Sequence, residues 1–550
     1  MFEPDAMKDT PSAGLGGTLR SLFRGRGHER GTARGALRPL VQPAELVPGE
    51  AARGNAMMAG DYGFAGEIVS APDGAPWADQ SAGAAWFDGL HGFAWLRDLR
   101  VLGSTGARGR ARALVLDWIE CSEGLPAPAR TPAVTGTRLA AWLVAYDFLI
   151  GGVDDSFARR FHAGVLAQIK LLVKAGRRGD DGAARLAALK GLIYSGVALA
   201  DGDRRLSQAL KAFDSELAEQ ILPDGVHVSR CPSVQLAVLR DLIDLRATLI
   251  AAHQEPPAVL QTSIDRMAPM LRGFRHGDGG LALFNDSFEE EAWLIDRVLG
   301  QADAKGRPLS DARHGGFQRI QAGRTLILMD AGAPPTSGRR GHAGTLSFEL
   351  SVGKERLIVN CGAWLGPDAH WAQALRNSAA HSTLTVDDTN SAVVLDEGGI
   401  GVGPNKIEAS REEKDGAVWL EASHDGYAQP FGLKHTRRLY VATDGSDVRG
   451  EDRLTSSGGS RRAGRGFTVR FHLHPEVQAS LVQDGSSVLL RLPSGAGWQL
   501  RAAGGTLDLG ESVYAGRAGE RRRTEQVLIT GGIGAEETIV KWALRRIPKG

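Results

Sequence analysis

Histidine and arginine gather in a few short stretches that interrupt the hydrophobic patterns of this sequence. In RNSAAHSTLTVDD (376–388), Arg376 precedes His381 by five residues, and the residues after His381 alternate as a strand does. A histidine at the mouth of a strand can act as a general acid or base, and an arginine beside it can hold a carboxylate. The alternative is a structural histidine that hydrogen-bonds the backbone and holds the loop.

A second stretch, DGVHVSRCPS (224–233), lies between two expected helices. It contains His227 and Arg230 in a loop closed by Pro232, so both side chains can project from a helix end. Histidine again offers acid–base chemistry and arginine offers carboxylate recognition. The alternative role for Arg230 is to cap a helix C-terminus or to pair with a carboxylate of the protein itself.

The third stretch is ASHDGYAQPFGLKHTRRLYV (422–441). A strand through its second part would place His435 and Arg437 on one face and Arg438 on the other. The alternative is a rim of solvated basic residues. His342, in GHAG, is a further candidate outside these stretches. The third stretch supplies His424, Tyr427, His435, Arg437 and Arg438.

The elements that must position these residues change character along the chain. From Trp86 to about Leu271, apolar residues recur at steps of three and four, which predicts about eight helices joined by short turns. Their pairwise succession indicates stacked helical hairpins, either a bundle or an α/α toroid. The stretch RHGDGGLALFNDS (275–287) breaks this period.

After about residue 315 the hydrophobic period becomes two. TLSFELSV (345–352) alternates apolar and polar residues, and six further segments repeat that pattern between glycine- and aspartate-rich turns. Many short strands of this kind are typical of an antiparallel β-sandwich. We therefore divide the chain into a flexible basic tail at 1–50, a helical domain at 51–310 and a β-sandwich domain at 311–550.

Composition narrows the function classes. The 65 basic and 64 acidic residues leave a net charge of +1, which does not favour nucleic-acid binding. The apolar stretch 139–150 is interrupted by Asp147 and is too short to span a membrane. The N-terminus shows no signal-peptide pattern, which predicts a cytoplasmic protein, or a periplasmic one if the start is mis-assigned. Three scattered cysteines fit a reducing compartment.

The order of these motifs resembles the heparinase II/III family over roughly residues 55–545. The resemblance is carried by WFDGLHGFAWLRDL and DGVHVSR, then by HAGTLSFEL, RNSAAHSTLTVDD, HDGYAQPFGLKHTRRL and RFHLHPEV. It implies a multidomain α+β fold, with an N-terminal α/α toroid followed by a C-terminal antiparallel β-sandwich. It also implies a polysaccharide lyase that cleaves beside a uronic acid by β-elimination, on a glycosaminoglycan or alginate-like substrate.

Such chemistry needs a base at C5, an acid for the leaving oxygen and a group that neutralises the sugar carboxylate. By resemblance, the acid–base residues are His381, Tyr427 and His227. The expected partner is an acidic polysaccharide or oligosaccharide, bound by Arg230, Arg376, His435 and Arg437. Some members hold a structural zinc ion, and His424 and Asp396 are its candidate ligands here.

The sequence departs from the family pattern in the helical domain. Ala183 and Ala184 stand near the position of an Asn-His pair, and Ser233-Val234-Gln235 replaces the usual Tyr-His pair after the DG motif. These departures leave a second interpretation open. The chain would then be a non-catalytic carbohydrate-binding protein, or a structural protein of the cell envelope, that retains the lyase fold.

Overall fold

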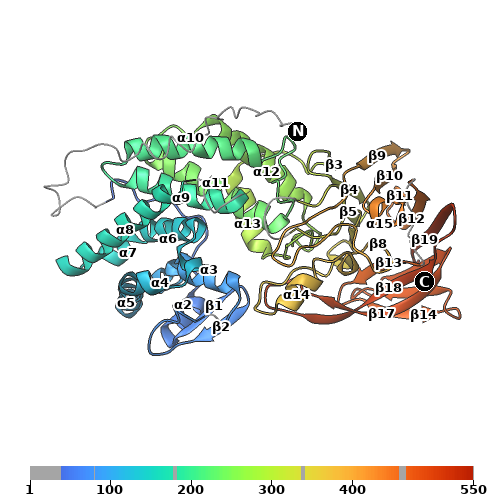
Figure 1. Cartoon of the computed structure of the whole chain (residues 1–550), viewed down its shortest axis with the longest axis horizontal. Helices are drawn as coiled ribbons and strands as arrows, with labels where there is room; N and C mark the ends of the chain where they lie inside the picture. The colour runs from blue at the N-terminus through green and yellow to red at the C-terminus, as the bar shows by residue number, and fades with distance from the viewer. Residues whose placement is uncertain (1–38, 80, 177–181, 336–340, 458–465, 549–550) are drawn as a thin grey trace, which may run out of the picture.

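The computed structural model describes residues 39–79, 81–176, 182–335, 341–457 and 466–548. Within these residues, helices dominate the N-terminal part, called the helical half here, and strands dominate the C-terminal part, called the sandwich half. Figure 1 shows the two halves side by side along the longest axis of the molecule. The predicted fold class, multidomain α+β with helices first and an antiparallel β-sandwich second, is confirmed.

The helical half begins its helices with side-chain caps at several points. Ser104, Thr131 and Asp154 each accept a backbone N–H from the first turn of the helix that follows. The helices are α2 (Ala51–Ala59), α3 (Ala84–Gly92), α4 (Leu96–Val101), α5 (Thr105–Cys121), α6 (Pro132–Val144), α7 (Tyr146–Ile150), α8 (Asp155–Ala175), α9 (Gly182–Ala198), α10 (Asp203–Gln220), α11 (Pro232–Ala251), α12 (Ala258–Gly273) and α13 (Ala292–Ala302). A short hairpin of β1 (Asp61–Phe64) and β2 (Glu67–Ser70), which the sequence did not predict, follows α2.

Two glycines allow α6 and α9 to cross with their backbones in contact. A Cβ atom on Gly136 would lie 2.4 Å from the carbonyl oxygen of Ala187, and one on Gly191 would lie 2.6 Å from the carbonyl oxygen of Gly136. A larger residue at either position would push the helices apart. The crossing therefore fixes α9, whose first turn borders the space between the two halves.

Residues 39–50, which the sequence analysis assigned to a flexible tail, lie against the helical half. The Ala44 N–H donates to Thr248 Oγ1 at 2.9 Å, and the Leu46 N–H donates to Asp244 Oδ1 at 2.8 Å. Side chains of α11 accept hydrogen bonds from the backbone of this segment. Its position therefore does not depend on a hydrophobic period of its own. The rest of the predicted tail, residues 1–38, lies outside the described residues.

The sandwich half consists of two antiparallel sheets. Its strands are β3 (Asp311–Ala312), β4 (Phe317–Ala322), β5 (Thr325–Asp330), β6 (Phe348–Val352), β7 (Glu355–Val359), β8 (Leu384–Val386), β9 (Ile407–Lys414), β10 (Ala417–His424), β11 (Leu433–Val441), β12 (Asp447–Ser456), β13 (Gly466–Leu473), β14 (Gln478–Val482), β15 (Ser487–Arg491), β16 (Gly497–Ala503), β17 (Thr506–Tyr514), β18 (Arg522–Gly532) and β19 (Glu537–Arg546). Two short helices, α14 (Ala369–Ala374) and α15 (Ala428–Phe431), interrupt them.

One sheet has the strand order β14-β15-β16-β19-β12-β11-β10-β9. The other has the order β17-β18-β13-β7-β6-β5-β4-β3, with β8 also paired to β13. Alternate residues of the central strands face a shared core, as the period-two pattern of the sequence predicts. The first sheet therefore has one face in the core and one that faces outward, whereas β5 and β6 of the second sheet are buried on both faces.

The two halves also share packed and charged contacts. Phe317, Leu326 and Leu328 of the sandwich half belong to the hydrophobic core of the helical half. Arg356 of β7 reaches back to the carboxylate of Asp278, which follows α12, at 2.7 Å. A junction of this kind holds the two halves in one fixed orientation.

A buried ionic network occupies the core of the sandwich. Asp452 accepts hydrogen bonds from Arg437 Nε at 2.7 Å, His435 Nε2 at 2.8 Å and Trp542 Nε1 at 3.0 Å. The side chains of Asp452, Arg437 and His435 have no exposed surface. Burial opposes ionisation of Asp452, but the charge of Arg437 and the hydrogen bonds from His435 and Arg437 hold its pKa below the usual range.

We predict that Asp452→Ala lowers the free energy of unfolding by about 3–5 kcal/mol, because Arg437 is left as a buried charge without its partner. The urea midpoint, followed by circular dichroism, measures this change. Glu421→Ala is the matched control, since Glu421 pairs with the half-exposed Arg438 on the outer face of the same sheet. The control should cost no more than about 1 kcal/mol. Equal midpoints for the two variants would refute a stabilising role for the network.

Candidate functional site

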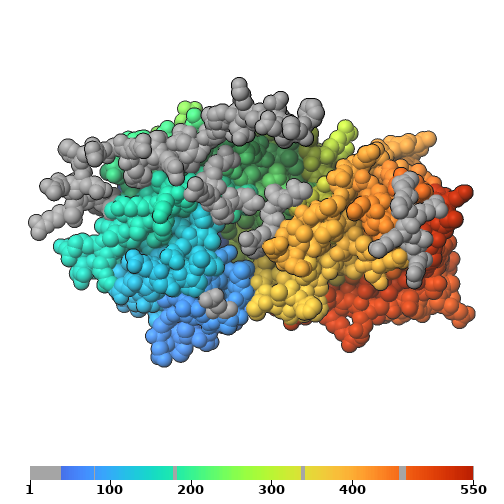
Figure 2. Space-filling model, viewed as in Figure 1, coloured from blue at the N-terminus to red at the C-terminus, as the bar shows by residue number. Residues whose placement is uncertain are grey.

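A cleft of about 490 Å³ lies between the helical half and the sandwich half. Figure 2 shows the two halves meeting along their boundary. The helical half contributes the first turn of α9, residues between 227 and 237, and the loop 286–290. The sandwich half contributes Pro335, Gly341 and Leu365. The volume falls in the range of about 300–1,000 Å³ that is usual for ligand sites.

The described lining of this cleft is apolar and acidic. Its charged side chains are the carboxyl groups of Asp286 and Glu290, and no lysine or arginine is among the described lining residues. Burial raises the pKa of Glu290. A carboxylate is stabilised by nearby cations and opposed by nearby carboxylates. These two carboxyl groups oppose the binding of a carboxylate beside them.

His227 lies at this cleft, but both of its ring nitrogens are engaged. Nδ1 accepts the backbone N–H of Ser229 at 3.1 Å, so Nε2 carries the proton and donates to Gln220 Oε1 at 3.1 Å. The residue is 1% exposed, and burial lowers the pKa of His227 to about 4. The ring is thus a neutral part of the loop that carries it.

Arg230 points away from the cleft into the sandwich half. Its guanidinium donates to the carboxylate of Asp330 and to the carbonyl oxygen of Gly315 at 2.7 Å. It also donates to the carbonyl oxygen of Ala333 and lies over the ring of Phe317, 4.7 Å from the centroid. Every nitrogen of this guanidinium therefore has a partner within the protein.

His381 belongs to a histidine pair beside the cleft. Its Nδ1 donates to the carbonyl oxygen of Asn377 at 2.8 Å, so its Nε2 accepts from His342 Nδ1 at 3.2 Å. His381 is 2% exposed, and burial next to His342 lowers the pKa of His381 to about 3. Its role as an acid–base residue stays a prediction, and the observed geometry makes it a support for His342.

His342 follows the cleft-lining residue Gly341 and is 2% exposed. Its Nε2 has no hydrogen-bond partner in the described part of the chain, and Asp286 Oδ1 lies 3.9 Å from it. Asp286 lines the cleft. Burial lowers the pKa of His342, and Asp286 acts in the opposite direction. A neutral ring nitrogen can accept a proton, so His342 with Asp286 is an acid–base candidate, although its Nε2 is buried in the described structure.

Arg376 and Tyr427 serve structural roles in the sandwich half. Arg376 Nε donates to the carbonyl oxygen of Gly341 at 3.1 Å, and the rest of its guanidinium donates to the 373–399 region. The Tyr427 hydroxyl donates to the carbonyl oxygen of Leu384 at 2.9 Å, and its ring lies in the core. Burial raises the pKa of Tyr427. Neither side chain presents a free polar group to the cleft.

His424, His435 and Arg437 form one chain of hydrogen bonds inside the sandwich. His424 Nδ1 accepts the N–H of Gly426 at 3.0 Å, and its Nε2 lies 3.2 Å from His435 Nδ1. His435 and Arg437 both donate to Asp452. Because Arg437 and both rings are fully buried, the structure does not bring His435 and Arg437 to the cleft as substrate-binding residues.

The predicted zinc ligands do not meet. Both nitrogens of His424 are engaged, while Asp396 is exposed and accepts a hydrogen bond from Gln373 at 3.3 Å. Among the residues that the structure describes, no three histidine, cysteine, aspartate or glutamate side chains are grouped to hold a metal ion. The arrangement of His424 and Asp396 therefore does not fit a zinc site.

Asn285 joins the two predicted clusters at the cleft. Its side chain donates to the carbonyl oxygen of Arg230 at 2.8 Å and accepts the N–H of His342 at 3.1 Å. The 224–233 loop and the His342–His381 pair are thus brought together across the junction. Sequence reasoning missed Asn285 and Asp286, because their only signal was a break in the helical period.

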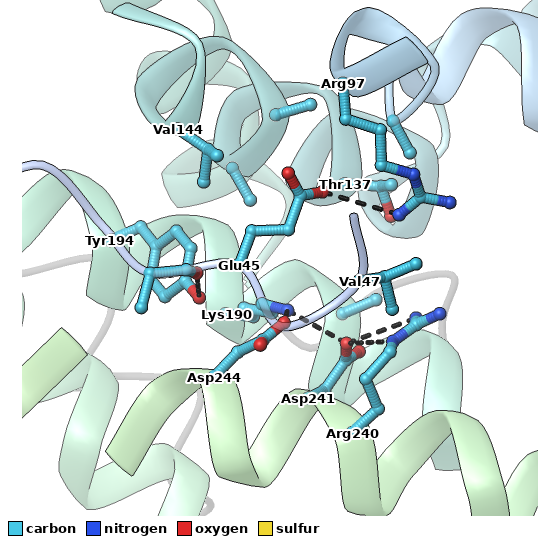
Figure 3. Close-up of a pocket in the computed structure, with 15 residues that line it drawn as sticks. Glu45, Val47, Arg97, Thr137, Val144, Lys190, Tyr194, Arg240, Asp241 and Asp244 are labelled. Atoms are coloured by element: carbon cyan, nitrogen blue, oxygen red, sulfur yellow. Dashed lines mark hydrogen bonds and ion pairs between the residues drawn. The ribbon is translucent and has the colours of Figure 1, made fainter. Parts of the chain in front are cut away.

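A second cavity, of about 80 Å³, lies inside the helical half under the segment 39–50. Figure 3 shows Glu45 of that segment beside Arg97, and Lys190 between Asp241 and Asp244. Lys190 Nζ lies 2.9 Å from Asp241 and 2.8 Å from Asp244. Cations and carboxylates balance in this small space. The ion pairs of Glu45 with Arg97 and Arg100 hold the segment in place.

Comparison with known proteins places the chain in a family. Residues 304–543 match the family described as heparinase II/III-like, C-terminal. The chain is 31% identical over 525 residues to FtsZ-localized protein C of Caulobacter vibrioides, covering 92% of this chain and 90% of that protein. The chain belongs to the heparinase II/III-like family. The predicted family is confirmed.

Solved structures of this family share the fold. A crystal structure of heparinase III matches with a TM-score of 0.73 at 14% identity, covering 88% of this chain and 81% of that one. The heparan sulfate lyase HepC from Pedobacter heparinus matches with a TM-score of 0.62 at 14% identity, covering 93% and 86%. These matches support the assignment of the helical half as an α/α toroid. Among the described residues, no helix combines the length and apolar character that a membrane crossing requires.

We predict that the protein loses stability as the pH falls below about 6.5. Unfolded histidine titrates near 6.5, whereas the folded pKa of His227 is about 4 and that of His381 about 3. Between these values the unfolded chain binds more protons, so each such ring lowers the free energy of unfolding by about 1.4 kcal/mol per pH unit. The effect is absent above pH 6.5 and stops growing below the folded pKa.

Urea midpoints between pH 7.5 and pH 5 measure this slope. His381→Asn should make it shallower by about one proton, because it removes one ring that stays neutral when folded. The matched control is the exposed His253→Asn, which should retain the slope. A slope that His381→Asn leaves unchanged would contradict the burial of a neutral ring.

Proposed function

We propose that this chain is a member of the heparinase II/III-like family that localises with FtsZ and does not carry out β-elimination. The observation that carries the loss of catalysis is the engagement of Arg230. A lyase needs a cation free to meet the sugar carboxylate. Here the Arg230 guanidinium donates hydrogen bonds to Asp330, Gly315 and Ala333 of the same chain.

The acid–base residues support the same proposal. His227 has both nitrogens engaged, and the Tyr427 hydroxyl bonds a backbone carbonyl in the core. The Asn-His and Tyr-His pairs of the family pattern are also missing from the sequence. In this proposal the chain has the fold of a lyase, and His227 and Tyr427 have structural roles.

The proposed location rests on the curated relative. FtsZ-localized protein C is similar over 92% of this chain, so the likeness includes both halves and the junction between them. The lyases of known structure share the fold at 14% identity. We also propose a cytoplasmic location, which fits the three free cysteines Cys121, Cys231 and Cys361.

A fluorescent fusion of the full chain, imaged together with FtsZ, tests the proposed location. The fusion should accumulate where FtsZ assembles and become diffuse after FtsZ is depleted. His253→Asn, at an exposed position of the helical half, serves as the matched control and should localise normally. A fusion that stays diffuse while FtsZ assemblies are present would exclude the proposal.

A polysaccharide lyase acting on an acidic glycan is the second candidate. It is favoured by the Nε2 of His342, which has no hydrogen-bond partner among the described residues. In that reaction His342 would take the C5 proton and return it to the departing O4, and Asp286, 3.9 Å away, would stabilise the ring while it is charged. The residues present leave the sugar carboxylate without a described cation. We therefore rank this candidate below the non-catalytic one.

A screen on several uronic-acid glycans decides between the two candidates, with ultraviolet absorbance reporting the unsaturated uronate. We expect no absorbance change above that of a protein-free control. If a glycan is cleaved, His342→Ala should reduce the rate by about a hundredfold or more. Cleavage with that sensitivity would establish the second candidate and remove the first.

A further inference from the structure

The outer face of the eight-stranded sheet carries one continuous row of side chains across five strands. Trp419 of β10 is opposite Tyr440 of β11, and Tyr440 is opposite Arg449 of β12. Arg449 is in turn opposite Ala543 of β19, which is opposite Arg501 of β16. With strands about 4.8 Å apart, four gaps give the row a length of about 19 Å.

The row is hollowed where its side chains are short. Ala543 and Ala503 on the outer face stand among longer residues, and the resulting groove has a volume of about 460 Å³. Trp419 is 42% exposed at one end, and its ring packs against Tyr440 with centroids 4.9 Å apart. The groove thus has an aromatic end and a short-chain floor.

Cations surround this groove in excess. Its lining contains Arg438, Arg449, Arg501 and Lys541 against one carboxylate, Glu451, while Glu421 at its edge also pairs with Arg438. Arg449 also lies over the Tyr440 ring, 5.2 Å from the centroid. With Glu421 and Asp447 counted beside Glu451, the four cations still leave a net positive charge, which attracts an anion.

The partners of the two arginines in the row differ. Arg449 pairs with Asp447 at 2.6 Å, outside the lining, whereas Arg501 donates to the neutral side chain of Gln483 at 3.0 Å. Arg501 forms no ion pair with a carboxylate among the described residues. Its charge is therefore available at the end of the groove that lies opposite Trp419.

We propose that this groove binds an acidic oligosaccharide, which lies across the strands with a sugar ring against the exposed Trp419 and a carboxylate against Arg501. A peptide fits less well. The five strands have neighbours on both sides, so their backbone groups are already paired and cannot extend a sheet onto a peptide. A ring polymer with acidic groups needs only the aromatic and guanidinium surfaces that this row offers.

This site is separate from the cleft between the two halves. The two share no lining residue, and the groove lies on the face of the sheet opposite to the core that holds Asp452. Glycan binding here goes beyond the proposed function, and its test in purified components is independent of where the protein localises.

Calorimetric titration of the full chain with an alginate tetrasaccharide at low salt tests the proposal. The tetrasaccharide should bind saturably, and Trp419→Ala/Arg501→Ala should weaken binding at least tenfold. Both side chains are exposed, so the fold should be retained, and an unchanged melting temperature checks this. Arg501→Glu, a single charge reversal, supplies a second variant that should lose binding.

The matched control is Trp293→Ala/Arg523→Ala, with the 43% exposed Trp293 on α13 and an exposed arginine on the other sheet. It should bind as the unchanged protein does, and the neutral cellotetraose should not bind the groove. Equal weakening by both double variants, or no saturable binding, would overturn the proposal. Groove-dependent binding of a glutamate peptide in place of the tetrasaccharide would assign the groove to an acidic protein segment instead.

Discussion

The guanidinium of Arg230 lies at the junction of the two halves, and the geometry of the cleft depends on its contacts. The Arg230 side chain extends from a loop of the helical half into the sandwich half, where it pairs with Asp330. The side chain of Asn285 donates to the carbonyl oxygen of Arg230. Arg230 has a positive φ of 52°, a backbone conformation that surrounding contacts must hold in place. Removing a partner from a buried pair leaves a charge in a low-dielectric surrounding, so the junction is strongly specified.

The same physical rule governs the histidines of the sandwich half. Burial favours the neutral ring, and a neutral ring donates from one nitrogen and accepts at the other. The rings therefore link into directional chains, from Gly426 through His424 and His435 to Asp452, and from His342 through His381 to Asn377. Such chains fix tautomers and ring orientations, which makes these residues supports of the fold.

The chain retains the fold of its family. The α/α toroid and the sandwich still enclose a cleft, but the described lining carries carboxyl groups where an acidic sugar would require a cation. In contrast, several cations of the sandwich half lie on the outer face of the eight-stranded sheet, in the groove beside Trp419 and Tyr440. The two sites therefore differ in charge: the described cleft lining carries carboxyl groups, and the groove on the outer face carries mostly cations.

Sequence periodicity alone determined the order of helical and sandwich halves, because the two repeats bury different sets of residues. It also placed His435 and Arg437 on one face of a strand and Arg438 on the other, as the burial pattern of β11 confirms. Only the tertiary structure decided which face is covered. The second sheet packs over His435 and Arg437, and contacts between residues about 100 positions apart bury Arg230. Alternation reveals which side chains share a face, but packing decides whether that face meets a substrate or the core.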